Sequence, residues 1–193
     1  AGFEALLPVG RWKGYGGGTN FNNRTFESLT WAAGLAALTN YSTIFSTVHA
    51  PLMHPVAVAK MSATIDHISN GRFALNVVAG WFKNEFEMFD AELKEHGARY
   101  AYAAEWLEVI KRLWTEEEPF DYDGAYFRGN ALWSQPKPIQ LPRPPIMNAG
   151  SSTMGQDFSA QYADMNFVML RQKDDESDAE QIEQLKTLGA DRG

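Results

Sequence analysis

The sequence contains no cysteine, which excludes disulfides, thiolate catalysis and thiolate metal sites. Its four histidines, His49, His54, His67 and His96, form neither an HExxH motif nor another zinc spacing, so we expect no metal site. The GxSxG motif of α/β-hydrolases is missing, and the glycine-rich segment matches neither GxxxxGKS/T nor GxGxxG. The sequence therefore has no motif for thiol, serine-hydrolase or P-loop chemistry.

Basic residues are also scarce. Lys and Arg number 17 against 24 Asp and Glu, which gives a net charge of −7, and no run of five or six basic residues occurs. Affinity for nucleic acid comes from clustered cations, so this composition argues against a nucleic-acid partner. No apolar stretch approaches the roughly 18–20 residues of a membrane-spanning helix, and no basic segment precedes an apolar core at the N-terminus. We therefore expect a cytoplasmic protein with no membrane partner.

Strand-like and helix-like segments alternate regularly along the chain. Strict alternation of this kind predicts a parallel sheet covered by helices, either as an open doubly wound sheet or as a closed eight-stranded barrel. The length favours the open sheet, because a complete barrel needs about 250 residues. We expect strands at 3–9, 42–48, 73–78, 145–149 and 166–170, and helices at 25–39, 54–68, 99–114, 151–164 and 178–188.

Local signals mark several element ends. Thr25 is a candidate N-cap, Pro55 suits the first position of a helix, and Asn70–Gly71 should end that helix. Residues 116–145 contain the turn signal Asp123–Gly124 and many prolines, so we expect an irregular excursion outside the main layers.

The ends of the predicted strands carry the candidate functional residues, because ligands of parallel α/β proteins bind beyond those ends. Arg11 follows the first strand and precedes the glycine-rich loop 13–23, where it either is solvated or reaches a ligand's electron-rich edge or anion. His49 ends the second strand and His54 precedes a helix, so each is either catalytic or structural. Trp81 follows the third strand and is a third catalytic candidate.

Asn76 places an amide inside an apolar strand, where an unpartnered amide costs a few kcal/mol. It therefore needs a partner, either a polar residue of the barrel interior or a ligand. Arg99 stands in the first turn of a helix, where a cation opposes the helix dipole, so either a bound anion or a nearby carboxylate such as Glu95 should offset it. Ser151 and Ser152 open another helix, either as ordinary caps or as part of a phosphate site.

Taken together, these motifs resemble the luciferase-like flavin-dependent monooxygenases. The resemblance covers nearly the whole chain in order and is greatest for the branch of pyrimidine, dimethylsulfone and alkanesulfonate monooxygenases. It implies a single bacterial-luciferase-type TIM (β/α)8 barrel domain over 1–193, incomplete here, with strands 2 to 6 present. The carrying runs are IDHISNGRFALNVVAGWFKNEFEMF, EHGARYAYAAEWLEVIKRLW and PIMNAGSSTMGQDFSAQYAD.

The resemblance also implies a cofactor and partners. Family members use reduced FMN, supplied in many cases by a separate NAD(P)H-dependent flavin reductase, and O2 to oxygenate a small organic substrate. Here that substrate would be a pyrimidine, a sulfone or a sulfonate-like molecule, and the protein would be a homo-oligomer. The positions that match cofactor-binding residues of the family are Gly10, Arg11, Asn76, Glu85, Arg99, Tyr100 and Ser152, together with Ser151 at the same helix start.

Two other functions remain open at this point. The same fold carries hydride-transfer enzymes that use the deazaflavin F420. A shortened barrel could also bind flavin without catalysis, as a non-fluorescent flavoprotein relative suggests.

Overall fold

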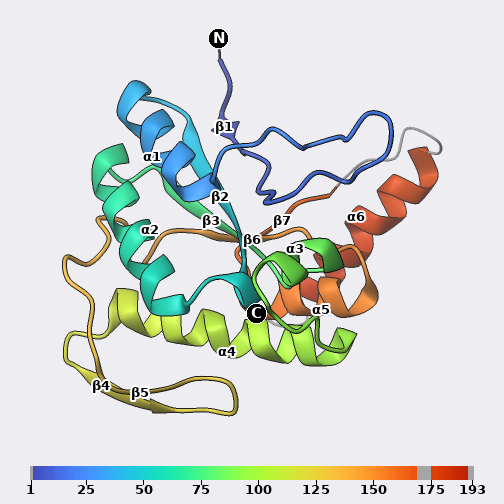
Figure 1. Ribbon diagram of the computed structural model, residues 1–193. Coiled ribbons are helices and arrows are strands. Elements are labelled where there is room, and N and C mark those ends of the chain that lie inside the picture. Colours follow the sequence, from blue (N-terminus) through green and yellow to red (C-terminus); the bar gives the residue numbers. More distant parts are fainter. Residues whose placement is uncertain (1, 169–174, 191–193) are drawn as a thin grey trace.

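The computed structural model describes residues 2–168 and 175–190, and a five-stranded parallel sheet runs through its centre (Figure 1). The strands lie side by side in chain order: β1 (Ala5–Leu6), β2 (Thr43–His49), β3 (Phe73–Val78), β6 (Ile146–Asn148) and β7 (Met165–Asn166). A doubly wound sheet reverses its strand order at a switch point, whereas a barrel adds each strand beside the previous one. The sheet is therefore half of a (β/α)8 barrel, not an open doubly wound sheet.

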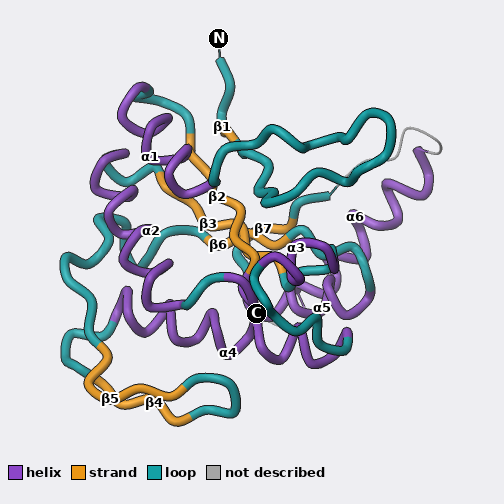
Figure 2. The backbone as a smooth tube through the Cα atoms, viewed as in Figure 1, coloured by secondary structure: helices purple, strands orange, loops and turns teal. Residues whose placement is uncertain are grey.

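Helices follow the strands, and most of them pack on one face of this half-barrel (Figure 2). The helices are α1 (Ser28–Leu38), α2 (Pro55–Ser69), α3 (Lys83–Met88), α4 (His96–Thr115), α5 (Thr153–Tyr162) and α6 (Asp175–Ala190), with a 3-10 turn at Ala50–Leu52.

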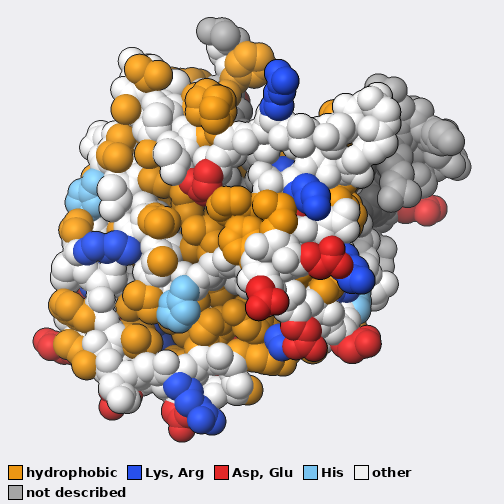
Figure 3. Space-filling model, in the orientation of Figure 1, with side chains coloured by type: hydrophobic (Ala, Val, Ile, Leu, Met, Phe, Trp, Pro, Cys, Tyr) orange, Lys and Arg blue, Asp and Glu red, His pale blue; other side chains and the backbone are white. Residues whose placement is uncertain are grey.

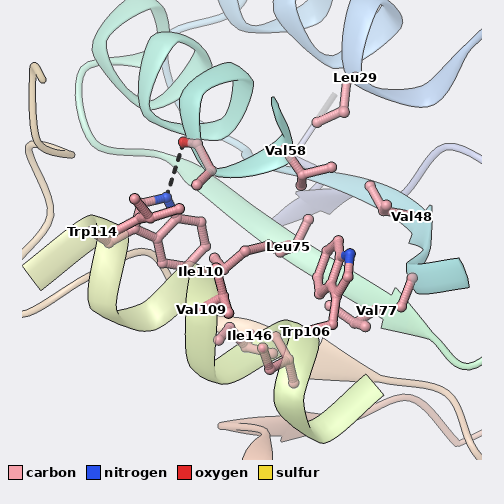
Figure 4. Close-up of a cluster of buried hydrophobic side chains, with 14 of the residues drawn as sticks. Leu29, Val48, Val58, Leu75, Val77, Trp106, Val109, Ile110, Trp114 and Ile146 are labelled. Atoms are coloured by element: carbon pink, nitrogen blue, oxygen red, sulfur yellow. Dashed lines mark hydrogen bonds between the residues drawn. The ribbon is translucent and has the colours of Figure 1, made fainter. Parts of the chain in front are cut away.

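The main core fills the space between the sheet and these helices (Figure 4). Residues that alternate along the strands, such as Leu75 and Val77, point outward and pack against the apolar stripe of α4. The two tryptophans of that stripe are buried, and their indole N–H groups donate to backbone carbonyls: Trp106 to Met53 at 2.7 Å and Trp114 to Ala59 at 3.1 Å. Both large rings thus enter the core without an unpaired donor.

The opposite face of the sheet is the concave side of the half-barrel. Phe45, Ala74 and Met147 form a second, smaller apolar cluster there. The next residues on the same side of β2 and β3, Thr47 and Asn76, are register partners, so the polar pair sits one step nearer the carboxyl ends of the strands.

Several predicted ends agree with the structure. Strand β3 has the predicted bounds, Pro55 is the first residue of α2, and His54 is its N-cap with the ring accepting from the Val56 N–H at 3.3 Å. Asn70 ends α2 in the left-handed conformation with φ of 54°.

Other ends differ. Helix α1 is capped by Glu27, whose carboxylate accepts from the Leu29 and Thr30 N–H groups, and not by Thr25, whose hydroxyl donates to the Arg11 carbonyl. The predicted strand 3–9 is shorter in the structure: only Ala5 and Leu6 pair with β2, opposite Thr43 and Ile44. The predicted strand 166–170 pairs at Met165–Asn166, and residues 169–170 lie outside the described residues.

The excursion 116–145 contains regular structure that the sequence does not predict. Strands β4 (Phe120–Asp123) and β5 (Arg128–Leu132) form an antiparallel hairpin. The Glu105 carboxylate of α4 accepts the N–H groups of Ala125, Tyr126 and Phe127 at 2.7 to 3.2 Å, and so holds the hairpin loop. Glu105 lies about twenty residues before the loop that it holds. Local residue patterns cannot reveal a contact between residues so far apart in the chain.

The surface carries many exposed apolar side chains. On the face drawn in Figure 3 they gather across the middle. Among the exposed ones are Phe26, Trp31 and Leu38, of which Leu38 is 86% exposed. Extended apolar surface commonly marks contact with other chains, so it is compatible with an oligomer, which stays a prediction. No helix of the described part of the chain is long and apolar enough to span a membrane.

Candidate functional site

A cleft of about 770 Å³ opens at the carboxyl ends of the strands. Its walls come from the carboxyl ends of β2, β3 and β6, from the segments that follow β1, β3 and β6, from the glycine-rich loop and from the start of α4. Ligand sites of small molecules and cofactors are typically about 300–1,000 Å³ and mostly apolar with a few placed polar groups, which describes this cleft.

Arg11 follows β1, lines the cleft and forms an ion pair with Glu85, which does not line the cleft. The Arg11 Nη1 atom lies 2.8 Å from Glu85 Oε2, and both side chains are more than nine-tenths buried. The other carboxylate oxygen, Oε1, accepts from the backbone N–H of Trp12 at 2.7 Å and of Lys13 at 3.4 Å. Glu85 stands in the first turn of α3, where the helix dipole favours an anion.

His49 adjoins this ion pair, with Nε2 3.7 Å from Glu85 Oε2. Burial lowers the pKa of His49 to about 4; the Glu85 carboxylate opposes this shift, and the Arg11 guanidinium adds to it. With this lowered pKa, His49 lines the cleft as a neutral imidazole near pH 7.

Aromatic rings surround the Arg11 guanidinium at the mouth of the cleft. Its Cζ atom lies 5.1 Å from the Tyr15 ring centroid, 5.0 Å from that of Trp81 and 5.8 Å from that of Phe82. Tyr15 of the glycine-rich loop also stacks on Trp81, with centroids 5.8 Å apart and planes 22° apart. These contacts join the loop to the turn after β3 and place flat apolar surfaces around a cation.

Asn76 presents a free acceptor to the cleft. Its Nδ2 donates to Thr47 Oγ1 at 3.0 Å, and Thr47 in turn donates to the Pro8 carbonyl at 3.2 Å. Within the described residues the Oδ1 atom has no hydrogen-bond partner, although the residue is only 4% exposed. The amide nitrogen of Asn76 thus has a partner within the barrel interior, and the amide oxygen is free to accept a hydrogen bond from a ligand.

Arg99, in the first turn of α4, also lines the cleft. Its Nη1 donates to the Gly80 carbonyl at 2.5 Å, while its buried Nε has no partner among the described residues. No carboxylate of the described chain lies within 4.0 Å of it, so the alternative of a salt bridge with Glu95 is not seen. The positive charge therefore stays uncompensated beside the first turn of α4.

Two glycines let the starts of α4 and α5 meet beside Arg99. A Cβ atom at Gly155 would lie 2.6 Å from the Tyr100 hydroxyl oxygen, and one at Gly150 would lie 2.7 Å from the Gly155 Cα. The Ser152 side chain caps α5 by accepting from the Gly155 N–H at 3.1 Å. The amino end of a ten-residue helix thus comes close to Tyr100.

The predicted residues divide into three groups by position. His54 lies apart, at the start of α2 with its ring edge against Phe127 at 5.9 Å. Three residues stand just behind or beside the walls: Glu85, Ser151 and Ser152. Seven line the cleft: Gly10, Arg11, His49, Asn76, Trp81, Arg99 and Tyr100.

Sequence reasoning missed Thr47, Gly80 and Asn148, which also line the cleft. Asn148 donates to the Val77 carbonyl at 2.7 Å and accepts from the Gly150 N–H at 2.8 Å, so it shapes the turn before α5. Thr47 could have been found, because it lies two residues before His49 and so shares its side of β2.

Comparison with known proteins identifies the family of this chain. A family model described as luciferase-like monooxygenase matches residues 1–193. Two relatives are named pyrimidine monooxygenase RutA. The protein of Variovorax paradoxus is 38% identical over 168 residues, which are 86% of this chain and 45% of its own length. That of Methylobacterium radiotolerans is 41% identical over 173 residues, which are 87% of this chain and 44% of its own length.

Solved structures show the same fold. Riboflavin lyase RcaE, solved with modified FMN and riboflavin, superposes with a TM-score of 0.86 at 22% identity and covers 97% of this chain and 48% of its own. This chain thus spans just under half the length of these three proteins, in keeping with a half-barrel. Because the family model matches the chain from end to end, the chain belongs to the luciferase-like monooxygenase family.

Proposed function

We propose that this protein is an FMN-dependent monooxygenase that uses reduced flavin and O2 to oxygenate a small organic substrate. The observation that carries the proposal is the cleft itself, which joins a free buried acceptor on Asn76 to an uncompensated cation on Arg99. FMN has a ring with N–H groups and a phosphate, so it complements both ends. The fold relative RcaE was solved with a modified FMN, which supports the choice of cofactor.

The residues on the two walls would divide the cofactor between them. Asn76 Oδ1 would accept from an N–H of the ring, and Arg11 would donate to the ring from the other side. Arg99, Tyr100 and the start of α5 with Ser151 and Ser152 would hold the phosphate, since a helix N-terminus and a guanidinium both favour an anion. When bound, FMN supplies the activation of O2, and the protein supplies position and dryness.

The ring end of the cleft suits a neutral substrate. Glu85 compensates the charge of Arg11, and His49 is neutral, so a sulfonate would meet no free cation among the described residues of this end. Tyr15 and Trp81 offer flat faces instead. These features, with the names of the two relatives, favour a pyrimidine over a sulfone or sulfonate. The reduced FMN would come from a separate NAD(P)H-dependent reductase, and the protein would act as a homo-oligomer.

Binding of FMN and of riboflavin by the apoprotein tests the assignment of Arg99. Arg99→Ala should raise the Kd for FMN about 10- to 100-fold, the effect of losing a charge-assisted hydrogen bond, and should change that for riboflavin by about twofold or less. Arg112→Ala is the matched control, because Arg112 lies on the same helix but pairs with Glu116. Equal losses for both flavins would contradict a phosphate role for Arg99.

Turnover tests the reaction itself. The enzyme supplied with reduced FMN and uracil should consume O2 and incorporate oxygen into the pyrimidine. Reduction or oxidation of F420 without O2 consumption would instead favour the hydride-transfer function. Flavin binding with neither activity would favour a non-catalytic flavin-binding protein.

A further inference from the structure

Glu85 is a cofactor position by family resemblance, but its surroundings suit a different role. Its side chain is 1% exposed and is absent from the cleft walls. Oε2 is engaged by Arg11, and Oε1 by the backbone N–H groups of Trp12 and Lys13. His49 Nε2, at 3.7 Å from Oε2, lies beyond hydrogen-bonding distance. All three donors come from consecutive residues of a segment more than seventy residues away in the chain.

We propose that Glu85 is a positioning residue that acts on the flavin only through Arg11 and the root of the glycine-rich loop. The inference rests on the proposed FMN site and concerns how that site is built. A carboxylate with both oxygens turned to one short segment holds that segment in place before any ligand arrives. Such preorganisation improves binding, because Arg11 is already ordered and loses little conformational entropy when the ligand binds.

The contacts of Arg11 extend this effect across the loop. The Arg11 carbonyl accepts from the Thr25 hydroxyl at 2.9 Å, so the two ends of the loop between them meet at Arg11. Its guanidinium contacts the rings of Tyr15 and Trp81 at the cleft mouth. A shift of Arg11 would therefore move the loop root, the aromatic mouth and the ring end of the cleft together.

Glu85 also decides how much charge Arg11 presents. The ion pair at 2.8 Å leaves Arg11 as a hydrogen-bond donor with little net charge. Without the carboxylate, the guanidinium would be an uncompensated cation and would stabilise the more negative, reduced form of a bound flavin.

A double-mutant cycle on FMN binding separates the two roles of Glu85. Arg11→Gln and Glu85→Gln should each raise the Kd about 10-fold, and the double variant should also raise it about 10-fold, because the second change removes nothing more. A Kd raised about 100-fold in the double variant would overturn the proposal, since additive losses mean separate contacts with the ligand. Glu87→Gln is the matched control on the same helix, with an exposed carboxylate paired to Lys83.

The midpoint potential of bound FMN gives a readout that a merely structural role would not move. Glu85→Gln should raise the potential, and the same change in the Arg11→Gln background should not. A rise in both backgrounds would show that Glu85 acts on the flavin directly and would overturn the proposal. If Glu85→Gln does not fold, Glu85→Asp keeps the charge and shortens the side chain, and it should weaken FMN binding without raising the potential.

Hydrogen exchange in the ligand-free protein tests the anchor independently of FMN. The Trp12 amide should exchange faster in Glu85→Ala than in the wild type or in Glu85→Gln, which keeps an acceptor. Unchanged exchange in Glu85→Ala would overturn the role of Glu85 as the anchor. Failure of the wild type to bind FMN, with this exchange pattern intact, would reject the proposed cofactor instead.

Discussion

At the amino edge of the parallel sheet, the charged groups of Arg72 and Asp66 have hydrogen-bond partners within the chain. At the carboxyl edge, Arg11 and Glu85 pair with each other, whereas Asn76 and Arg99 each keep a buried polar atom without a partner among the described residues. Arg72, just before β3, donates through its guanidinium to Ser69, Thr39, Ser42 and Ala36. Four residues after Arg72, within β3, Asn76 Oδ1 has no partner in the described part of the chain.

The carboxylate of Asp66 likewise has its partners within the chain. It is fully buried at the end of α2 and accepts from the Ile139 N–H, the Gln140 N–H and the Gln140 side chain at 2.6 to 3.0 Å. It thereby ties the segment after the hairpin back to the sheet. At the carboxyl edge, Arg99 keeps an unpartnered Nε among the described residues. Barrel proteins generally keep stability at the amino edge and binding at the carboxyl edge, and in this half-barrel the unpartnered atoms of Asn76 and Arg99 lie at the carboxyl edge.

The largest effect is expected at the amino edge. Asp66→Ala should lower the free energy of unfolding by about 3–5 kcal/mol, because it removes the buried carboxylate that accepts from the Ile139 N–H, the Gln140 N–H and the Gln140 side chain. Urea denaturation measures the loss, and the Kd for FMN of the folded protein should not change. Asp66→Asn, which keeps one acceptor oxygen, should lose less. A stable Asp66→Ala variant with weakened FMN binding would break the division between the edges.

A pH effect of intermediate size is expected from His49 at the carboxyl edge. Because its pKa is lowered from 6.5 to about 4 in the folded protein, the unfolded chain binds a proton in that range that the folded chain does not. Stability should therefore be complete above about pH 6.5 and fall by up to about 3 kcal/mol as the pH drops towards 4. Denaturation at several pH values should show a flatter profile for His49→Gln. The same slope in both proteins would assign the loss to other groups.

The smallest effect on stability is expected at Asn76. Asn76→Leu should change the free energy of unfolding by about 1 kcal/mol or less, because it removes both a hydrogen bond and an unpaired buried oxygen. The same variant should raise the Kd for FMN about 10-fold or more. Asn76→Asp keeps the acceptor and should retain more affinity. A large loss of stability in Asn76→Leu would mean that the amide serves the fold and not a ligand.

The amino-acid pattern predicted the order of the elements well. The unbroken apolar run of β3, the proline that opens α2 and the left-handed Asn70 that ends it act through neighbouring residues, so they can be read locally. The pattern predicted less well those elements whose stabilising contacts come from residues far away in the chain. The hairpin loop between β4 and β5 is held by Glu105 of α4. Helix α1 begins at Ser28 and is capped by Glu27, while the Thr25 hydroxyl donates to the distant Arg11 carbonyl.

By itself, the sequence determined the parallel α/β class, the family and the residue types at the strand ends, because periodicity, turn chemistry and residue order are properties of the chain alone. Only the tertiary structure decided which of those residues share a cleft. It brought Arg11, Asn76 and Arg99 together, left His54 on the start of α2, and set Glu85 behind Arg11. The physical reason is that the register of β2 and β3 and the packing of α3 and α4 determine which side chains meet. These tertiary contacts bring residues that are far apart in the chain within hydrogen-bonding distance.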